Sequence, residues 1–315
     1  MKGWLKRLGP LAGLAFVFAL FAILTPGKFA TADNLQLMLL QTAVVGTAAL
    51  GMTMVIISGG IDLSVGSVIA LTTVIIALLL NSGAPPLAAA LGGVAGGMIC
   101  GSMIGMLITR VRLAPFIVTL GMWGALRGAA KGLANEQMIV TPSTWLNKLL
   151  NILPAEQKWM LLPPGVWLML LLAVAVAILL RYTRKGRHIF AVGSNELAAR
   201  VCGVPVERTK LVVYMLGSGF AATAGILQFS YLTVGDPTTA TGMELDIIAA
   251  VVIGGGSLAG GEGSVLGSLV GALIMTVVGN GCTKMELPNW VQEIVAGGII
   301  VVAVALDRLR HRRKL

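Results

Sequence analysis

Residues 36–81 read QLMLLQTAVVGTAALGMTMVIISGGIDLSVGSVIALTTVIIALLLN. Two apolar runs, 36–58 and 64–81, flank a short polar segment that contains Asp62. Each run has about the 20 residues that an α-helix needs to cross a hydrocarbon core about 30 Å thick. Inside lipid the backbone must satisfy its own hydrogen bonds, and a helix does so. The stretch therefore predicts two transmembrane helices joined by a polar break.

The rest of the chain has the same character. Of its 315 residues, 57% are hydrophobic and 11% are charged, and the mean hydropathy is +0.91. A soluble domain is typically about 25% charged, so a water-soluble fold is excluded. The sequence predicts an all-α integral membrane protein, with one transmembrane domain over residues 1–315 and about ten spans. The expected spans are 9–26, 36–58, 64–81, 86–109, 113–132, 163–181, 209–232, 243–259, 262–282 and 290–306.

Charge orients the predicted helices. The formal net charge is +10, and most of the 23 basic residues fall in alternate connections, in the first residues and in the tail after 306. Basic residues stay on the cytoplasmic side of a membrane protein. The pattern therefore predicts an inner-membrane protein in contact with lipid, with both termini cytoplasmic. Because the charges lie between apolar runs, they favour topology signals over a nucleic-acid surface, and no nucleic-acid partner is expected.

The residues that usually carry catalysis or bind metals are scarce. Cys100, Cys202 and Cys282 are far apart, and His188 and His311 lie in basic segments, so neither a disulfide framework nor a metal site is predicted. No nucleophile–base pair is recognisable, so the chain is not expected to be an enzyme or to hold a cofactor. The P-loop pattern G-x-x-x-x-G-K-[ST] does not occur, and any ATP must be bound by a partner.

Two connections are longer than a turn. Residues 135–162 form the predicted external loop, which is either an interfacial loop or a docking surface. Residues 182–209 form the predicted cytoplasmic loop, in which a helix of about eight residues is expected over 194–202. Ser194 or Asn195 can cap its start, Glu196 suits its first turn, and Gly203 can end it. A helix this short is not stable alone. It is therefore expected to dock either on the helix bundle of its own chain or on a partner.

Two glycine-rich breaks interrupt the apolar pattern. The first contains Asp62, whose carboxylate near the membrane indicates either a gate on the transport path or a helix cap. The second, GGGSLA at 254–259, formally fits a dinucleotide fingerprint, but its membrane-length flanks exclude that interpretation. Residues 55–69 and 252–266 resemble each other weakly, as expected for an internal duplication in a transporter.

Glycines spaced by four residues occur in three of the predicted spans. Such stripes let helix backbones approach closely in a membrane, so tight packing inside the bundle is expected of them. They are Gly93, Gly97, Gly101 and Gly105; Gly124, Gly128 and Gly132; and Gly263, Gly267 and Gly271.

Three segments together resemble one known family. They are IISGGIDLSVGS at 56–67, AVGSNELAARVCGVPVERTK at 191–210 and AAVVIGGGSLAGGEGSVLGSLVGA at 249–272. They are similar to the ribose/xylose-type monosaccharide permeases of ATP-binding cassette (ABC) importers, and the resemblance covers about residues 10–307. It implies that two permease subunits pair, that cytoplasmic ATP-binding subunits energise them, and that a periplasmic binding protein delivers the sugar.

The resemblance also implies roles for individual residues. The loop helix would be the coupling helix, and its small face of Ala198, Ala199 and Cys202 would enter a cleft on the ATPase. Alternatives are a secondary carrier or channel, or an ABC permease for another small polar solute such as an amino acid. A carrier would usually have several buried acids, whereas the candidates here besides Asp62 are Glu244 and Asp246. The coupling candidates are Ser194, Asn195, Glu196, Ala198, Ala199, Arg200, Gly203 and Arg208, and the path or gate candidates are Ser58, Gly59, Gly60, Asp62, Ser64, Gly254, Gly255 and Gly256.

Overall fold

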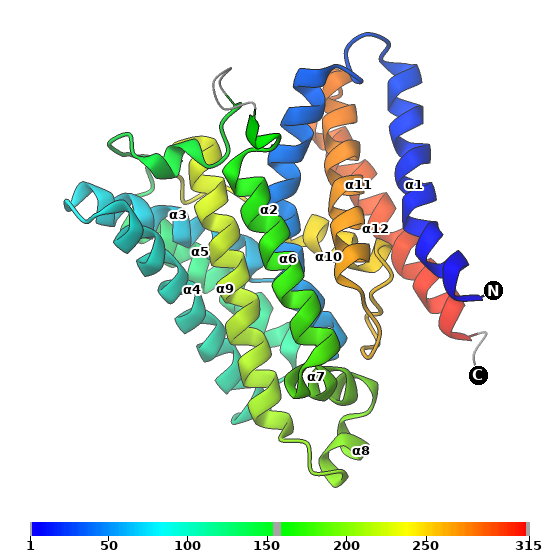
Figure 1. The fold of residues 1–315 in the computed structure, drawn as a ribbon. Coiled ribbons are helices and arrows are strands. Elements are labelled where there is room, and N and C mark those ends of the chain that lie inside the picture. The colour runs from blue at the N-terminus through cyan, green and yellow to red at the C-terminus, as the bar shows by residue number, and fades with distance from the viewer. Residues whose placement is uncertain (1, 154–158, 313–315) are drawn as a thin grey trace.

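The computed structural model describes residues 2–153 and 159–312, which form a bundle of α-helices (Figure 1). Lys158 and the basic tail residues Arg313 and Lys314 lie outside the described residues. Within the described ranges the helices are α1 (Lys2–Leu24), α2 (Ala32–Ile57), α3 (Val65–Asn81), α4 (Pro86–Thr109), α5 (Pro115–Leu133), α6 (Pro164–Tyr182), α7 (Arg184–Ser194), α8 (Glu196–Val201), α9 (Val206–Leu232), α10 (Met243–Ile253), α11 (Val265–Lys284) and α12 (Asn289–Arg312).

Each of the ten expected spans coincides with one of these helices, but not each is long enough to span alone. Among the described residues, five helices have the length and apolarity to cross a membrane: α2, α4, α6, α9 and α11. The run expected over 243–259 is helical only to Ile253, so α10 has 11 residues and is about 16 Å long. The membrane-type helical bundle is confirmed, whereas the number of crossings stays a prediction.

The centre of the bundle is α2, which is buried along most of its length and contacts α6, α9, α10 and α11. Two of the glycine stripes pack as predicted. A Cβ atom added at Gly97 or Gly101 would meet α9, and one added at Gly267 or Gly271 would overlap the backbone of residues 250–254. Close backbone contact of this kind gains dispersion energy where lipid provides no hydrophobic driving force.

The stripe on α5 behaves differently. Added Cβ atoms at Gly124, Gly128 and Gly132 would meet no other atom within 4 Å. The expectation that this stripe packs inside the bundle is wrong for the single chain, because no other helix of the described residues covers that face. Its small residues are open to a neighbour from outside the chain.

The connection after α5 folds against the bundle instead of extending away from it. Strand β1 (Ile139–Val140) pairs antiparallel with β2 (Val234–Gly235), which follows α9, so that Ile139 lies opposite Gly235. Thr144 caps the 3₁₀ helix η1 (Trp145–Lys148), and Leu146 within this helix is buried. The sequence analysis predicted a loop here and no strand.

Candidate functional site: the loop helices and the two helix breaks

The connection between α6 and α9 contains two helices where one was predicted. In α7 the residues Gly186, Ile189 and Val192 are buried, while Arg184 and Lys185 are exposed. The Thr183 hydroxyl caps the start by accepting from the Gly186 amide at 3.1 Å. The spacing of three between the buried residues is helical and was the signal that could have predicted α7.

The second helix, α8, is shorter than predicted. It covers six residues, and the Asn195 side chain caps it by accepting from the Ala198 amide at 2.9 Å. Ser194 belongs to the end of α7, where its hydroxyl donates to the Phe190 carbonyl. Gly203 has a φ of +79°, the left-handed conformation in which glycine ends a helix, so the predicted stop is confirmed.

The predicted small face is only partly exposed: Ala198 and Cys202 are exposed, whereas Ala199 points into the protein. Ala199 is 6% exposed and packs with Val192 of α7 and Val206 of α9. The larger apolar side chains that the α8 region exposes are Leu197, 76% exposed, and Val201, 89% exposed. These two residues are four apart and lie on one helix face. We call Leu197 and Val201 the α8 tip.

Ion pairs connect α8 to the start of α9. Lys210 donates to Glu196 at 2.5 Å, and Arg200 donates to Glu207 at 2.5 Å and lies 3.6 Å from Glu196. The hydrogen bond to Glu207 raises the pKa of the Arg200 guanidinium. Since most of these side chains are about half exposed, each pair contributes little to stability but orients the loop.

The first helix break follows α2 directly. Ser58 ends the helix, Gly59 has a φ of +79°, and Gly60 lies against the Tyr214 side chain of α9. Asp62 is 2% exposed, and its Oδ1 accepts from the amide of Ser64 at 2.8 Å and from its hydroxyl at 2.6 Å. Ser64 is the residue before α3, so Asp62 fixes the start of that helix.

The second break, between α10 and α11, reaches the first one. The Gly261 amide donates to the Ile57 carbonyl at 2.9 Å, which joins the end of α2 to the segment before α11. Gly193, near the end of α7, lies against the same carbonyl, so that an added Cβ would overlap it. Gly59 and Gly260 also face Gly193. We call Gly59, Gly193, Gly260 and Gly261 the glycine junction.

The structure thus brings together both predicted breaks and the predicted loop, in a contact made by backbone atoms. The sequence analysis named Gly59 of this junction and missed Gly193. Gly254, from the second break, packs against the backbone of Gly267. Gly255 has a φ of +94°, and a Cβ added there would meet no other atom within 4 Å. A displacement of α7 would therefore act on both breaks at once.

A second polar cluster joins α5, α10 and the segment that precedes α10. The Trp123 indole N–H donates to Glu244 Oε1 at 3.0 Å, and Arg127 Nη1 donates to the carbonyls of Pro237 and Thr239 at 3.1 and 2.6 Å. Within the described residues, Arg127 Nε and Nη2 and Glu244 Oε2 are buried without a hydrogen-bond partner. The sequence analysis named Glu244 as a candidate buried acid and did not single out Arg127. Buried donors and a buried acceptor of this kind are the groups that bind solute hydroxyls.

A bundle of apolar helices, with two polar breaks meeting a basic loop, defines an integral membrane permease. The chain belongs to the family described as the permease component of branched-chain amino acid transport systems, whose model matches residues 34–304.

Several relatives are similar along nearly the whole chain. The ribose import permease protein RbsC of Escherichia coli (strain K12) is 38% identical over 310 residues, which cover 98% of this chain and 96% of that protein. RbsC of Bacillus subtilis (strain 168) is 37% identical over 97% of this chain and 94% of its own. The L-arabinose ABC transporter permease protein AraH of Azospirillum brasilense is 33% identical over 99% and 92%. The resemblance to ABC permeases is confirmed.

Proposed function

We propose that this chain is the membrane-spanning subunit of an ABC importer that moves a monosaccharide across the bacterial inner membrane. The supporting observation is the similarity over 98% of the chain to a ribose import permease, together with that to an L-arabinose permease over 99%. The single permease domain over residues 1–315 carries no P-loop, so ATP hydrolysis is assigned to a separate subunit.

We assign three protein partners to distinct surfaces. Cytoplasmic ATP-binding subunits dock on the α8 tip, beside Ala198 and Arg208, while Asn195, Glu196, Arg200 and Gly203 hold the loop in shape. A second permease subunit packs on the open glycine stripe of α5, where small residues permit close approach. A periplasmic binding protein docks at the opposite end, on the folded loop that contains β1 and η1.

The path is assigned to the two breaks. Ser58, Gly59, Gly60, Asp62 and Ser64 form one gate segment. The other gate segment is Gly254, Gly255 and Gly256. Their backbone can change conformation where helical hydrogen bonding is interrupted, as in the broken helices of other transporters. The unpaired polar atoms of Arg127 and Glu244 offer a neutral, hydroxyl-rich solute a site between the gate and the outside.

Substitutions at Asp62 distinguish a gating role of its charge from a structural role at the start of α3. Its Oδ1 accepts from the amide and hydroxyl of Ser64, the N-cap residue of α3, so Asp62 forms a turn that positions the helix start, and asparagine retains the accepting oxygen. We therefore expect Asp62→Asn to keep most sugar uptake, whereas Asp62→Ala loses about 1 kcal/mol of stability with these hydrogen bonds. Uptake of labelled sugar and thermal unfolding measure the two effects. Loss of uptake by well-folded Asp62→Asn would show that the charge itself gates the path.

We propose ten crossings with both termini in the cytoplasm. The start of α1 and the end of α12 point toward the same end of the bundle as α7 and α8 in Figure 1. The basic residues of α7 support a cytoplasmic position for that end. A reporter fused after Leu315 or within 182–209 is expected to be cytoplasmic, and one fused after Lys148 periplasmic. A periplasmic reporter after Leu315 would contradict the topology.

Reconstitution tests the function. The purified permease is placed in proteoliposomes with its ATP-binding subunit and binding protein, and uptake of labelled ribose, xylose, arabinose and leucine is measured. We expect uptake of one sugar that requires both ATP and the binding protein. Uptake without the ATP-binding subunit would instead indicate a secondary carrier or channel, and uptake of leucine alone an amino-acid permease.

A further inference from the structure

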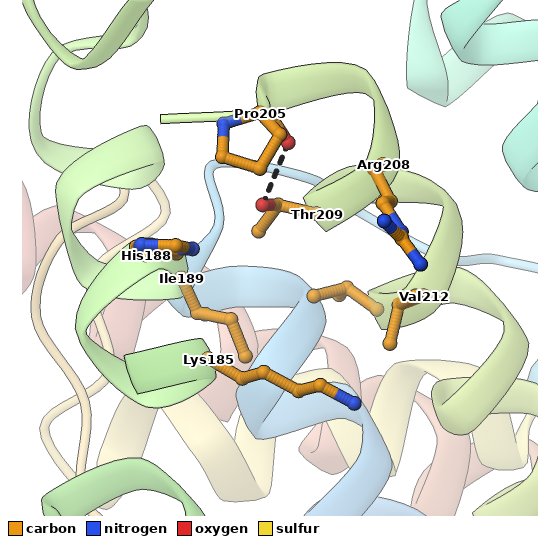
Figure 2. A pocket seen from close by; sticks show the side chains of 8 residues that line it. Lys185, His188, Ile189, Pro205, Arg208, Thr209 and Val212 are labelled. Carbon is orange, nitrogen blue, oxygen red and sulfur yellow. Dashed lines mark hydrogen bonds between the residues drawn. The ribbon is translucent and has the colours of Figure 1, made fainter. Parts of the chain in front are cut away.

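A cavity of about 360 Å³ lies between α7 and α9 and has not been used in the argument above. Figure 2 shows its lining: Lys185, His188 and Ile189 come from α7, and Arg208 and Val212 from α9. Ile189, Val212 and Val213 form an apolar wall. The three bases Lys185, His188 and Arg208 lie around that wall, so the cavity is apolar within and basic at its edge.

The basic edge lacks a counter-charge within the described part of the chain. None of the ion pairs among the described residues includes Lys185 or Arg208, and Glu196 and Glu207 pair with Arg200 and Lys210. Two cations beside an apolar cavity attract an anion that carries a hydrocarbon part.

The cavity lies at the level of the membrane surface. The spanning helix α6 ends at Tyr182, whose exposed ring has the Arg181 guanidinium 5.5 Å from its centre. Tyrosine and arginine at a helix end mark the headgroup region. The next helix, α7, buries one apolar face and exposes its basic one, as interfacial helices do. Lys185 follows Tyr182 by only three residues, across the extended residue Thr183 that separates α6 from α7, and so lies close to headgroup depth.

We propose that this cavity binds one anionic phospholipid of the cytoplasmic leaflet, such as phosphatidylglycerol. The phosphate lies between Lys185 and Arg208, and the upper part of an acyl chain lies along Ile189, Val212 and Val213. Pockets of about 300–1,000 Å³ hold a drug-sized ligand, so the headgroup and first methylenes enter while the rest of the lipid stays in the bilayer.

Such a lipid would connect the helices that hold the coupling loop. The α7 helix carries Gly193 of the glycine junction, and α9 begins directly after α8. A bound lipid bridges α7 and α9 on the membrane side and so fixes the loop between them. The proposal depends on the membrane location of the chain and not on the identity of the transported solute.

Lipid titration of the purified, delipidated chain tests the site. Phosphatidylglycerol and phosphatidylcholine are added separately, and bound lipid is counted by native mass spectrometry. We expect phosphatidylglycerol to bind at least about tenfold more tightly. The double variant Lys185→Gln/Arg208→Gln is expected to bind it about thirtyfold more weakly. Val212→Trp keeps both charges and fills the cavity, so it is also expected to lose the lipid.

Arg184→Gln/Arg187→Gln is the matched control, because it removes the same total of two positive charges, both from α7 residues outside the cavity lining. We expect its affinity to stay within about twofold of the wild type. An equal loss in this control, or equal binding of both lipids, would overturn the proposal in favour of diffuse attraction. Equally tight binding of soluble glycerol phosphate would show that the cavity binds anions without an acyl chain, and would contradict the lipid proposal. Displacement of lipid by the purified ATP-binding subunit would assign the cavity to that protein. Size-exclusion profiles confirm that each variant is folded.

Discussion

Gly193→Ala is expected to abolish ATP-driven sugar uptake while the permease stays in the membrane. The alanine Cβ would overlap the Ile57 carbonyl oxygen and crowd the Gly261 amide. Both are backbone atoms, which cannot rotate away as a side chain can. The carbonyl also accepts the Gly261 hydrogen bond that joins the two breaks, so moving it separates them. Overpacking of this kind typically costs about 1–3 kcal/mol.

The measurement is uptake in proteoliposomes together with ATP hydrolysis stimulated by the binding protein. We expect Gly193→Ala to bind the ATP-binding subunit but to show less than about a tenth of wild-type uptake, since a shift of 1.4 kcal/mol is already tenfold. Gly279→Ala on α11 is the control, because nothing lies within 4 Å of its added Cβ. Near-normal uptake by Gly193→Ala would mean that loop motion does not pass through the glycine junction. An unchanged size-exclusion profile distinguishes this loss from misfolding.

Helix positions could be predicted from the sequence because membrane-length apolar runs are hard to mistake. The limits of α2, α4 and α6 differ from the predicted runs by only a few residues. The end of α10 at Ile253 could not be predicted, since the glycines after it continue an apolar pattern that a span can also contain. The helix α7 was missed because its 11 residues are too polar and too few for a span.

Local signals predicted the caps of α8, but not its orientation. Asn195 and Gly203 affect only the backbone of adjacent residues, so both helix-end signals could be recognised in the sequence. The burial of Ala199 depends on Val192 and Val206, which reach it only through the fold. On so short and apolar a helix, either face could have been the inner one.

Contacts between segments that are distant in the chain could not be predicted from the sequence. The glycine junction depends on residues near 57, 193 and 261 meeting in space, and no pattern in one sequence records that. The glycine stripes make the same point. Those of α4 and α5 have the same spacing, yet only the first is covered within the described chain. Spacing indicates that a helix can be approached closely, and does not say by what.

The α8 tip gives the other large expected effect. We expect Leu197→Asp/Val201→Asp to weaken binding of the ATP-binding subunit about thirtyfold or more, and to abolish uptake. A few buried apolar residues at the centre of an interface can each contribute 2 kcal/mol or more, and a carboxylate there is left desolvated. The permease itself should fold normally, because both side chains are exposed in the isolated chain. Pull-down of the ATP-binding subunit and ATP-driven uptake measure the loss.

The choice of position decides what this experiment can show. A bulky side chain at Ala199 would disrupt the packing on Val192 and Val206, so a loss of uptake there could not separate docking from folding of the loop. Ile152→Asp is the control, because it adds a carboxylate at an exposed apolar residue of the predicted external loop. It should leave binding of the ATP-binding subunit within about twofold of the wild type. A secondary carrier needs no such subunit, so full uptake by the tip variant would count against both the docking role of α8 and the ABC mechanism.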